Sequence, residues 1–521
     1  MAVEGFALDK RRMTVFDALI AASREFGPSK KILIDQDRKP ISYLDAMRAA
    51  FALGSKIRSF TQRREPVGVL LPSSVGVAVT FFALQAIGRT PAMLNFTSGA
   101  INLTAACRGA GIKTILTARK FVDQGKLGDL IEALAGQCRI VYLEDVRASV
   151  GIFDKLYAAI AAAFPRVFAA PTKPSDPGVV LFTSGSFGAP KGVLLTQSNL
   201  VANCRQVAQQ IPLDPSWTFV CPLPTFHCFG LTGGVLLPLL TGMRAALYPS
   251  PLHHKQIPEF VRDVNGTILV GTDTFVQHYA RAAKPGDFAS LKFIVCGAER
   301  VREETHQLFA ERFGVEIIEG YGATEAAPII AVNRPGFNCP GTVGPLLPGI
   351  EARLEPVPGL DNAGKLIVRG PNVMAGYLKG DGTLAHEPTP GGWHDTGDVV
   401  RIGENGCVAI LGRVKRFAKI GGEMVSLTAI ENYASEIWPG VRHAVVSVPC
   451  HRKGERLVLV TECQEAETGS FLNWAQRNGA PELAIPRKVV KVGEVPVLGT
   501  GKTDYGAVQK LASDLVEVEA A

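Results

Sequence analysis

The strongest constraint on the fold is an alternation of short, apolar, β-branched runs with helix-like segments from about residue 60 to about residue 400. VVLFT (179–183), TILVG (267–271), FIVCG (293–297) and VEIIEG (315–320) read as buried strands, and the helix-like EETHQLFAERF separates the last two. Ser198 is the expected N-cap of a further helix, which follows the first strand region. Such alternation predicts an α/β fold in which helices cover a largely parallel sheet.

The chain of 521 residues is too long for one compact core, so we expect it to divide into domains. Residues 341–411 are rich in glycine and proline and contain short strands such as GKLIVRG, which indicates a small antiparallel β subdomain. Beyond GRVKR, a helix pattern begins near Leu427 and strands follow it. We therefore predict a large N-terminal domain of α/β subdomains plus that β subdomain (1–411), and a small, mobile α+β C-terminal lid domain (412–521), with a hinge near 412–416.

Composition narrows the class of protein. Hydrophobic residues make up 47% of the chain and charged residues 20%, which is typical of a folded protein, and a net charge of +7 is too small for this length to indicate nucleic-acid binding. Ten cysteines without a CxxC pair favour reduced thiols in a cytosolic protein. The N-terminal segment lacks the apolar stretch of a signal peptide. We expect a cytoplasmic protein, with the inner face of the membrane as an alternative location.

The most apolar segment is CFGLTGGVLLPLLTGM (228–243), which carries no charge and is interrupted by glycines and Pro238. It is short for a membrane span, so it predicts a buried wall or pocket, with a span as the alternative.

A glycine-rich loop, TSGSFGAPKG (183–192), follows the first of these strands. It is not a Walker A loop, because Pro190 stands where that motif has the glycine before its lysine. GTGKTD (499–504) fails as well, because Pro496 stands where the first glycine is required. Inward-facing N–H groups, hydroxyls and Lys191 still favour an anion site, and a surface hairpin with a solvated lysine is the alternative.

Further motifs follow in order along the chain: PTFHCFG (224–230), GAE (297–299), GYGATE (320–325), WHDTGD (393–398), GRVKRFAKIGGEMVS (412–426) and GTGKTD (499–504). With the loop they resemble the adenylate-forming superfamily, which includes acyl-CoA synthetases, luciferases and the adenylation domains of peptide synthetases. The resemblance implies a ligase that uses ATP and Mg²⁺ to form a carbon–sulfur bond. A carboxylate attacks the α-phosphate to give an acyl-adenylate and pyrophosphate, and a thiol then displaces AMP.

The resemblance also implies roles for the matched residues. The loop would hold the β- and γ-phosphates, Tyr321 would lie against adenine, Thr324 would contact the α-phosphate and Glu325 would ligate Mg²⁺. Asp398 would accept ribose hydroxyls, with Arg413 on the ribose or phosphate side. Core packing for Tyr321, a surface charge for Glu325 and a turn role for Asp398 are the alternatives. The expected nucleotide-binding set is Thr183, Ser184, Gly185, Ser186, Gly188, Lys191, Gly297, Ala298, Glu299, Gly320, Tyr321, Gly322, Thr324, Asp398 and Arg413.

A second group of implied roles concerns the small domain. Lys502 would reach the carboxylate and the α-phosphate during adenylation, whereas outside its motif it would be one more exposed lysine. Lys415 stands at the expected hinge position. After adenylation the small domain is expected to rotate and to present KIGGEMVS to the thiol, with a pantetheine tunnel at Lys419, Gly421 and Gly422; a tight turn is the alternative reading of those glycines.

The implied catalytic residues are Lys502, Glu325, Lys191 and His227. His227 would line or gate the acyl pocket, although a histidine on an apolar stretch is more often a core residue. The segment after it has no charged residue to meet an ammonium group, so a hydrocarbon chain fits better than an amino acid. Phe187 departs from the pattern, because the family generally has threonine there, and this departure puts one phosphate contact in doubt.

A closer resemblance concerns the acceptor. LPTFHCFGLTGGVLLPLLTG, LYPSPLHHKQIPE and RFAKIGGEMVSL look like the synthetase part of bacterial acyl-acyl carrier protein synthetases that are fused to 2-acylglycerophosphoethanolamine acyltransferases. The acyltransferase pair H-x-x-x-x-D is not matched, because Glu259 follows His254 at that spacing. We expect a synthetase alone, acting on a fatty acid and acyl carrier protein, with peripheral membrane association left open.

Two other readings stay open at this stage. The first is a medium- or long-chain fatty acyl-CoA ligase, because coenzyme A presents the same thiol and the near-neutral segment from residue 412 onward does not decide between the acceptors. The second is a non-catalytic acyl or nucleotide binder. Neither the chain length of the acid nor an oligomeric state follows from the sequence.

Overall fold

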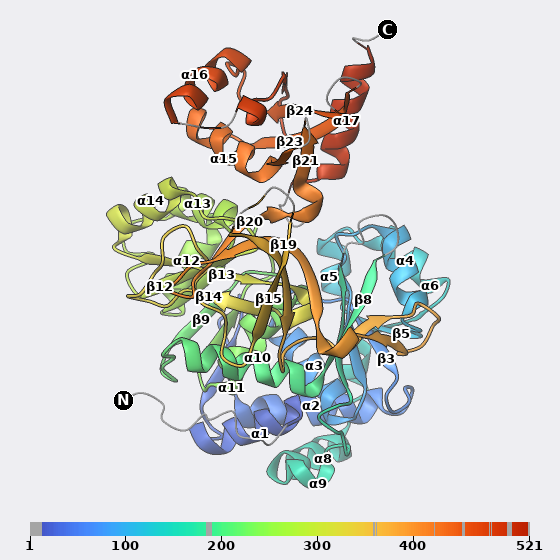
Figure 1. Cartoon of the computed structure of the whole chain (residues 1–521). Coiled ribbons are helices and arrows are strands. Elements are labelled where there is room, and N and C mark those ends of the chain that lie inside the picture. Colours follow the sequence, from blue (N-terminus) through green and yellow to red (C-terminus); the bar gives the residue numbers. More distant parts are fainter. Residues whose placement is uncertain are drawn as a thin grey trace. The chain divides into compact units, whose positions relative to one another are not determined.

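The computed structural model describes residues 13–183, 190–357, 360, 362–420, 423–450, 454–478, 480, 482–497 and 503–518 (Figure 1). The chain forms two compact units. The larger comprises Met1–Glu351 and Arg369–His394, and the smaller comprises Ala352–Val368 and Asp395–Ala521. The functional division at residue 411, with a hinge at 412–416, stays a prediction.

The larger unit contains a first eight-stranded sheet, ordered β14-β13-β12-β11-β9-β10-β1-β2. Its pairs are parallel from β1 through β13, and an antiparallel strand closes each edge. The central strands are apolar and buried, as parallel strands covered on both faces should be. Its strands are β1 (Lys31–Ile34), β2 (Ile41–Ser42), β9 (Thr218–Cys221), β10 (Arg244–Leu247), β11 (Ile268–Gly271), β12 (Phe293–Gly297), β13 (Glu316–Gly322) and β14 (Ile329–Val332).

A second eight-stranded sheet of the same unit has the order β18-β17-β8-β7-β4-β3-β5-β6. Its β4, β3, β5, β6 and β7 pair in parallel, whereas β8, β17 and β18 extend it antiparallel. Its strands are β3 (Pro66–Val69), β4 (Thr90–Met93), β5 (Thr114–Thr117), β6 (Arg139–Tyr142), β7 (Pro177–Thr183), β8 (Lys191–Thr196), β17 (Gly376–Leu378) and β18 (His386–Pro388).

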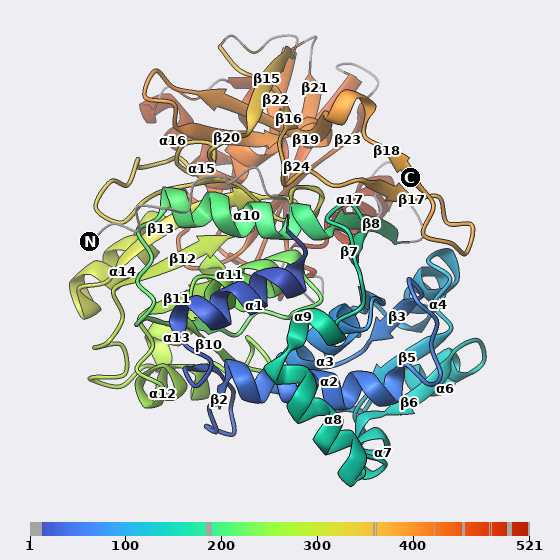
Figure 2. The ribbon, with the colours of Figure 1, turned by 90° about the horizontal axis from the view of Figure 1, so that it is seen from below.

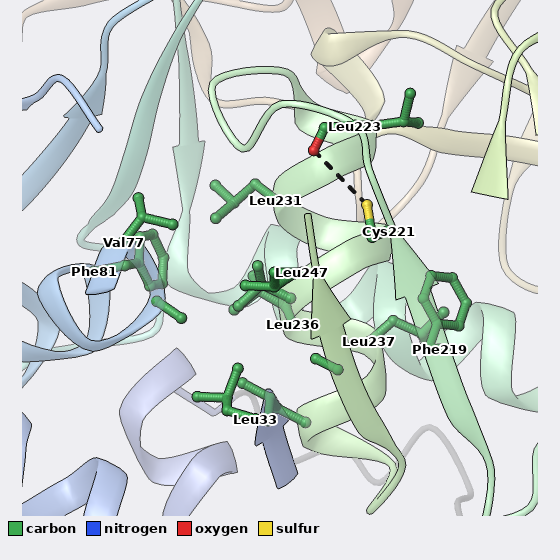
Figure 3. Packing of buried hydrophobic residues seen from close by; sticks show 14 of the residues in the cluster. Leu33, Val77, Phe81, Phe219, Cys221, Leu223, Leu231, Leu236, Leu237 and Leu247 are labelled. Carbon is green, nitrogen blue, oxygen red and sulfur yellow. Dashed lines mark hydrogen bonds between the residues drawn. The ribbon is translucent and has the colours of Figure 1, made fainter. Parts of the chain in front are cut away.

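Helices cover these sheets and join their cores. One cluster of buried side chains includes residues of both sheets, and Figure 3 shows Val77 and Phe81 of α3 facing Leu231 and Leu236, with Phe219 of β9 on the far side. Among the described residues the helices of this unit are α1 (Val15–Phe26), α2 (Tyr43–Ile57), α3 (Val75–Ala86), α4 (Ala100–Gly109), α5 (Arg119–Gln124), α6 (Gly128–Ala135), α7 (Leu143–Ala148), α8 (Ile152–Ala163), α9 (Pro165–Phe168), α10 (Gln197–Gln210), α11 (Leu237–Leu240), α12 (Gln256–Asp263), α13 (Asp273–Ala282) and α14 (Glu303–Phe313).

The sequence placed one helix start incorrectly. Helix α10 begins after Thr196, whose hydroxyl accepts from the Asn199 N–H while the Asn199 side chain accepts from the Thr196 N–H. Ser198, the predicted N-cap, therefore lies inside the first turn, where its hydroxyl contacts that of Thr196 at 3.1 Å. Together the Thr196 and Asn199 side chains satisfy two backbone N–H donors, whereas a serine N-cap at position 198 would satisfy one.

The predicted buried wall is confirmed. Residues Phe229–Leu236 form a π-helix, η1, and α11 continues it, with nearly every side chain buried. The glycines allow this helix to press against the sheet, since a Cβ on Gly234 would lie 2.4 Å from the Cys221 sulfur. Within the part of the chain that the structure describes, we find no helix long and apolar enough to cross a bilayer.

The smaller unit contains a four-stranded sheet, β15-β16-β19-β20, and a sheet with the order β22-β21-β24-β23, in which β25 also pairs with β24. The helix predicted from Leu427 is confirmed as α15 (Leu427–Ile437), capped by Ser426. The other elements are β15 (Glu351–Pro356), β16 (Gly364–Arg369), β19 (His394–Ile402), β20 (Val408–Arg413), β21 (Phe417–Ile420), β22 (Glu423–Ser426), β23 (His443–Cys450), β24 (Gly454–Thr461), β25 (Lys488–Lys491), α16 (Thr468–Asn478) and α17 (Tyr505–Val518).

The strands of residues 341–411 therefore belong to two different sheets. Strands β15, β16, β19 and β20 form their own sheet, as expected, but β17 pairs with β8 and extends the second large sheet. The mixed α/β architecture predicted from the sequence is otherwise confirmed.

Candidate active site

The glycine-rich loop joins two antiparallel strands. Thr183 ends β7 and Lys191 begins β8, and these two residues are direct partners in the strand register. Their pairing brings the two residues that flank the loop sequence next to each other. Lys191 is exposed there. The predicted phosphate contacts Ser184, Gly185, Ser186 and Gly188, and the atypical Phe187, lie outside the described residues.

Lys191 and Glu325 meet at a tyrosine that the sequence motifs did not single out. Tyr377 lies on β17, next to β8, and its hydroxyl donates a hydrogen bond of 2.7 Å to Oε1 of Glu325. The Lys191 ammonium lies 5.1 Å from the centre of the same ring. The backbone N–H of Met374 donates to the Glu325 carbonyl at 2.8 Å, which fixes the short 3₁₀ turn η2 (Thr324–Ala326). A cation and a carboxylate are thus oriented around one ring.

The GAE and GYGATE motifs lie side by side at the carboxyl ends of β12 and β13. Gly297 and Gly320 are partners in parallel register, and a Cβ on Gly297 would lie 3.3 Å from the Phe229 ring. Gly297 therefore lets the helix η1 approach the sheet closely. Tyr321 is buried, which agrees with packing against either core or adenine, and Ala298 and Gly322 are exposed at the edge. Ligands of α/β sheets bind outside such carboxyl ends.

Glu299 is held by α13, the helix that precedes it in the chain. Its Oε2 accepts from the backbone N–H of Thr274 at 3.2 Å and from the Thr274 hydroxyl at 3.0 Å, so it helps to cap α13. Its predicted place near the nucleotide stays a prediction.

His227 lies directly before η1 and is half-buried, with the Phe226 ring centre 4.6 Å from its own. Burial raises the pKa of the neighbouring Cys228 thiol to about 12, and the negative charge of Glu325 acts in the same direction. The PTFHCFG motif and the Glu325 turn are therefore close enough to interact electrostatically, as a common site requires.

In the smaller unit, Asp398 and Arg413 face each other across β19 and β20. They are register partners, and the Arg413 Nε donates to Oδ1 of the buried Asp398 at 3.0 Å. The Asp398 N–H donates to the Thr396 hydroxyl at 3.1 Å, and Gly397 takes a φ of 70° that favours glycine. Asp398 thus has both the turn role and a pairing with Arg413, and its ribose contact stays a prediction.

The predicted lid residues are only partly described. Lys415 is exposed on a single 3₁₀ turn (Val414–Arg416), and the backbone of Lys419 belongs to β21. Gly421, Gly422 and Lys502 lie outside the described residues. An antiparallel bridge pairs Val497 with Thr503, which lie on either side of residues 498–502.

A largely buried ion pair, not predicted from the sequence, stabilises the smaller unit next to the predicted hinge. Arg416 Nη2 lies 2.6 Å from Oε1 of Glu431, and the Tyr505 hydroxyl donates to Oε2 of Glu431 at 3.0 Å. The guanidinium also lies 3.8 Å above the Tyr505 ring. Burial raises the pKa of Glu431, and the positive charge of Arg416 opposes that shift. This cluster connects the segment after Lys415 with the segment after Lys502.

Known proteins resemble this chain over most of its length. A feruloyl-CoA synthase from Amycolatopsis is 28% identical over 489 residues, covering 90% of this chain and 94% of its own. A medium-chain fatty-acid–CoA ligase from Escherichia coli is 29% identical over 338 residues, covering 62% and 59%. Among solved structures, ATP-bound MatB from Rhodopseudomonas palustris superposes with a TM-score of 0.81 at 24% identity, covering 96% of this chain and all of that chain, which shows the shared fold.

The sequence profile of one enzyme family matches residues 21–378, which span the glycine-rich loop, both motifs at the ends of β12 and β13, and Tyr377. A match over more than half of the chain, together with a fold shared along nearly its full length, identifies the family. The chain belongs to the AMP-binding enzymes.

Proposed function

We propose that this protein uses ATP to activate a fatty acid as an acyl-adenylate and then transfers the acyl group to a phosphopantetheine thiol. The observation that carries the proposal is the grouping of Lys191, Tyr377 and Glu325 beside the ends of the phosphate loop. A nucleoside triphosphate that carries a divalent cation needs a positive charge near its phosphate oxygens, which Lys191 supplies, and a carboxylate ligand for the cation, which Glu325 supplies.

The chemistry requires little beyond charge stabilisation and orientation. A carboxylate oxygen attacks the α-phosphorus, and the bond to the bridging oxygen of the β-phosphate breaks, releasing pyrophosphate. The thiol sulfur then bonds to the acyl carbon, and the acyl–oxygen bond breaks to release AMP, with the thiol proton passing to solvent. Lys191 stabilises the charge that develops on the departing phosphates. In this proposal Lys502 does the same on the α-phosphate side.

The residues present fit a magnesium ion. Mg²⁺ prefers hard oxygen ligands and commonly takes one or two protein carboxylates, with phosphates and waters completing the shell. Glu325 supplies such a carboxylate, and the Tyr377 hydroxyl restrains one of its oxygens without adding charge. When bound, the ion would neutralise phosphate charge, and Glu325 would orient it.

A hydrocarbon acid is the proposed substrate because the wall beside His227 is apolar. The π-helix η1 and α11 contain no charged side chain to pair with an ammonium group or a second carboxylate. Burial of each methylene contributes about 0.8 kcal/mol, so such a wall favours chain length. The fatty-acid substrate named for the Escherichia coli relative supports this choice.

Acyl carrier protein is the proposed acceptor, on the local resemblance of the His227 and GGEMVS segments to acyl-acyl carrier protein synthetases. Coenzyme A is the second candidate, because both sequence relatives described above carry CoA-ligase names. The two acceptors present the same thiol, so the first step of the reaction is identical for both.

Pyrophosphate release and thioester formation test the proposal together. The protein is incubated with ATP, Mg²⁺ and a series of fatty acids, with carrier protein and coenzyme A offered separately. We expect pyrophosphate that depends on the fatty acid, and thioester on the carrier protein. Thioester on coenzyme A alone would reassign the acceptor, and no pyrophosphate with any acid would refute the enzymatic proposal in favour of a binder.

Lys191→Ala and Glu325→Gln should each lower pyrophosphate release by on the order of a hundredfold, because each removes a charge directed at the phosphates or their cation. Lys284→Ala is the matched control. Lys284 is an exposed lysine of the same unit that pairs with Glu259 at 2.7 Å, and its loss should leave activity unchanged.

A further inference from the structure

Helices α8 and α9 expose large apolar side chains to solvent. Phe153 is 83% exposed, Val167 is 78% exposed and Phe164 is 62% exposed. Ile152, Leu156 and Ile160 are exposed as well and follow the same outer face along the helix. Figure 1 shows both helices at the lower margin of the larger unit, and in Figure 2, which is seen from below, they face the reader. Contiguous apolar surface of this kind marks an interaction site in folded proteins.

The polarity of α8 is the reverse of that of an ordinary surface helix. Its buried face consists mainly of small residues, Ala158, Ala161 and Ala162, whereas phenylalanine, leucine and isoleucine point outward. The helix is nevertheless well anchored to α2, because Lys56 pairs with Asp154 at 2.6 Å and the rings of Tyr157 and Phe51 meet edge to face. These contacts use the inner face of α8, and most of the surface of Ile152 and Phe153 stays outside them.

The charges of this segment suit an anionic partner. Lys155, Arg166 and Lys173 are exposed cations within residues 152–173. Asp154 is the single acidic residue in that range, and the Lys56 ion pair balances its charge. The preceding helix α7 adds no net positive charge, because exposed Glu144 and Asp145 accompany its exposed Arg147, so the cationic character rests on residues 152–173. Apolar side chains flanked by lysine and arginine are the combination by which helices lie at the surface of anionic bilayers.

We propose that α8 and α9 form a docking surface for an anionic lipid bilayer. The six exposed apolar side chains enter the boundary between headgroups and acyl chains, and Lys155 and Arg166 lie among the lipid phosphates. The side chains project from a helix pair at the rim of the unit, so a flat, deformable lipid surface can receive all of them. Docking would place a fatty-acid-activating enzyme beside the phase in which its substrate dissolves; that consequence rests on the proposed function, whereas lipid binding does not.

Flotation with lipid vesicles tests the proposal on the full chain. Vesicles of phosphatidylcholine alone are compared with vesicles that also contain phosphatidylglycerol, at low and high salt. Wild-type protein should float with the anionic vesicles and less at high salt. Phe153→Ser combined with Phe164→Ser should lower the partition coefficient by about tenfold or more, since each ring contributes over a hundred Å² of apolar surface.

The matched control combines Ile101→Ser with Phe337→Ser, two exposed apolar residues outside this segment, and should float like the wild type. Equal flotation of the Phe153/Phe164 variant, or no flotation of the wild type with anionic vesicles, would overturn the proposal. A concentration-dependent dimer that this variant converts to a monomer in light scattering would assign the surface to a second copy instead. Pyrophosphate release with a water-soluble acid and no vesicles tests the proposed function separately.

Discussion

Tyr377→Phe is the most informative substitution at the proposed site, because it removes one hydroxyl and keeps the ring. The lost contact is the 2.7 Å hydrogen bond to Oε1 of Glu325, while the ring still faces the Lys191 ammonium. Hydrogen bonds to charged groups contribute about 1.5–3 kcal/mol, and both partners here are half-buried, so the lower end applies. About 1.5 kcal/mol corresponds to about a tenfold loss.

The assay is the kcat/KM for magnesium-ATP in pyrophosphate release at saturating fatty acid. Without this hydrogen bond the Glu325 carboxylate is less well oriented, and the main effect should be weaker binding of the cation and the triphosphate. We therefore expect the KM for magnesium-ATP to rise more than kcat falls. Tyr377→Leu, which also removes the ring beside Lys191, should cost about a further twofold to fivefold.

Tyr279→Phe provides the matched control. It removes a hydrogen bond of 2.8 Å from a buried tyrosine of the same unit to the Pro251 carbonyl, away from the loop. It should lower thermal stability and leave kcat/KM unchanged. If Tyr377→Phe matched the wild type within twofold while Glu325→Gln was inactive, the reasoning that Tyr377 orients Glu325 would be refuted.

Two further predictions concern stability in each unit. Hydrogen bonds from Ser42 lower the pKa of Asp45 to about 2, so Asp45→Asn should lower the free energy of unfolding by about 1 kcal/mol at neutral pH. The difference in thermal unfolding between this variant and the wild type should shrink as the pH falls from about 4 to about 2, because the wild-type carboxylate then takes up a proton and its contribution is lost. Arg416→Ala leaves the buried Glu431 without its cation and should destabilise the smaller unit by about 3–5 kcal/mol, seen as faster hydrogen exchange in α15 and α17. That loss should diminish at acidic pH, where Glu431 takes up a proton, and Arg416→Ala with Glu431→Gln should recover most of it; unchanged exchange in the single variant would contradict the assignment.

The sequence was sufficient to locate strands and helices where the local residue pattern agrees with the burial of the element. The runs 179–183 and 293–297 fall within β7 and β12, the run 267–271 begins one residue before β11, and the predicted helix EETHQLFAERF coincides with α14. Strands buried on both faces are apolar along their whole length, so their positions need no knowledge of partners. The order of the motifs along the chain was enough to predict that Lys191 and Glu325 belong to the same site.

Long-range pairing was not readable from the sequence. Tyr377 follows Lys191 by nearly two hundred residues, and only the pairing of β17 with β8 brings its hydroxyl to Glu325. Its signal was a single tyrosine in a three-residue strand, which no periodicity distinguishes from a surface residue. The Arg416–Glu431 pair was equally hidden, because isolated charges in a sequence give no sign of being buried together.

The exposed face of α8 was missed for a different reason. Its composition is that of an ordinary apolar helix, and only burial shows that the alanines face inward and the large side chains outward. Hydrophobic periodicity predicts that a helix has an apolar face, but it does not reveal whether that face meets the core or a partner.

Isotope transfer from the acid tests the central claim most directly. The protein is supplied with a fatty acid labelled with oxygen-18 in its carboxylate, together with ATP, Mg²⁺ and the thiol acceptor, and the products are separated by mass spectrometry. If the acid is activated as an acyl-adenylate, one labelled oxygen must appear in AMP and none in pyrophosphate. Label in inorganic phosphate, or AMP without label while thioester accumulates, would contradict the account.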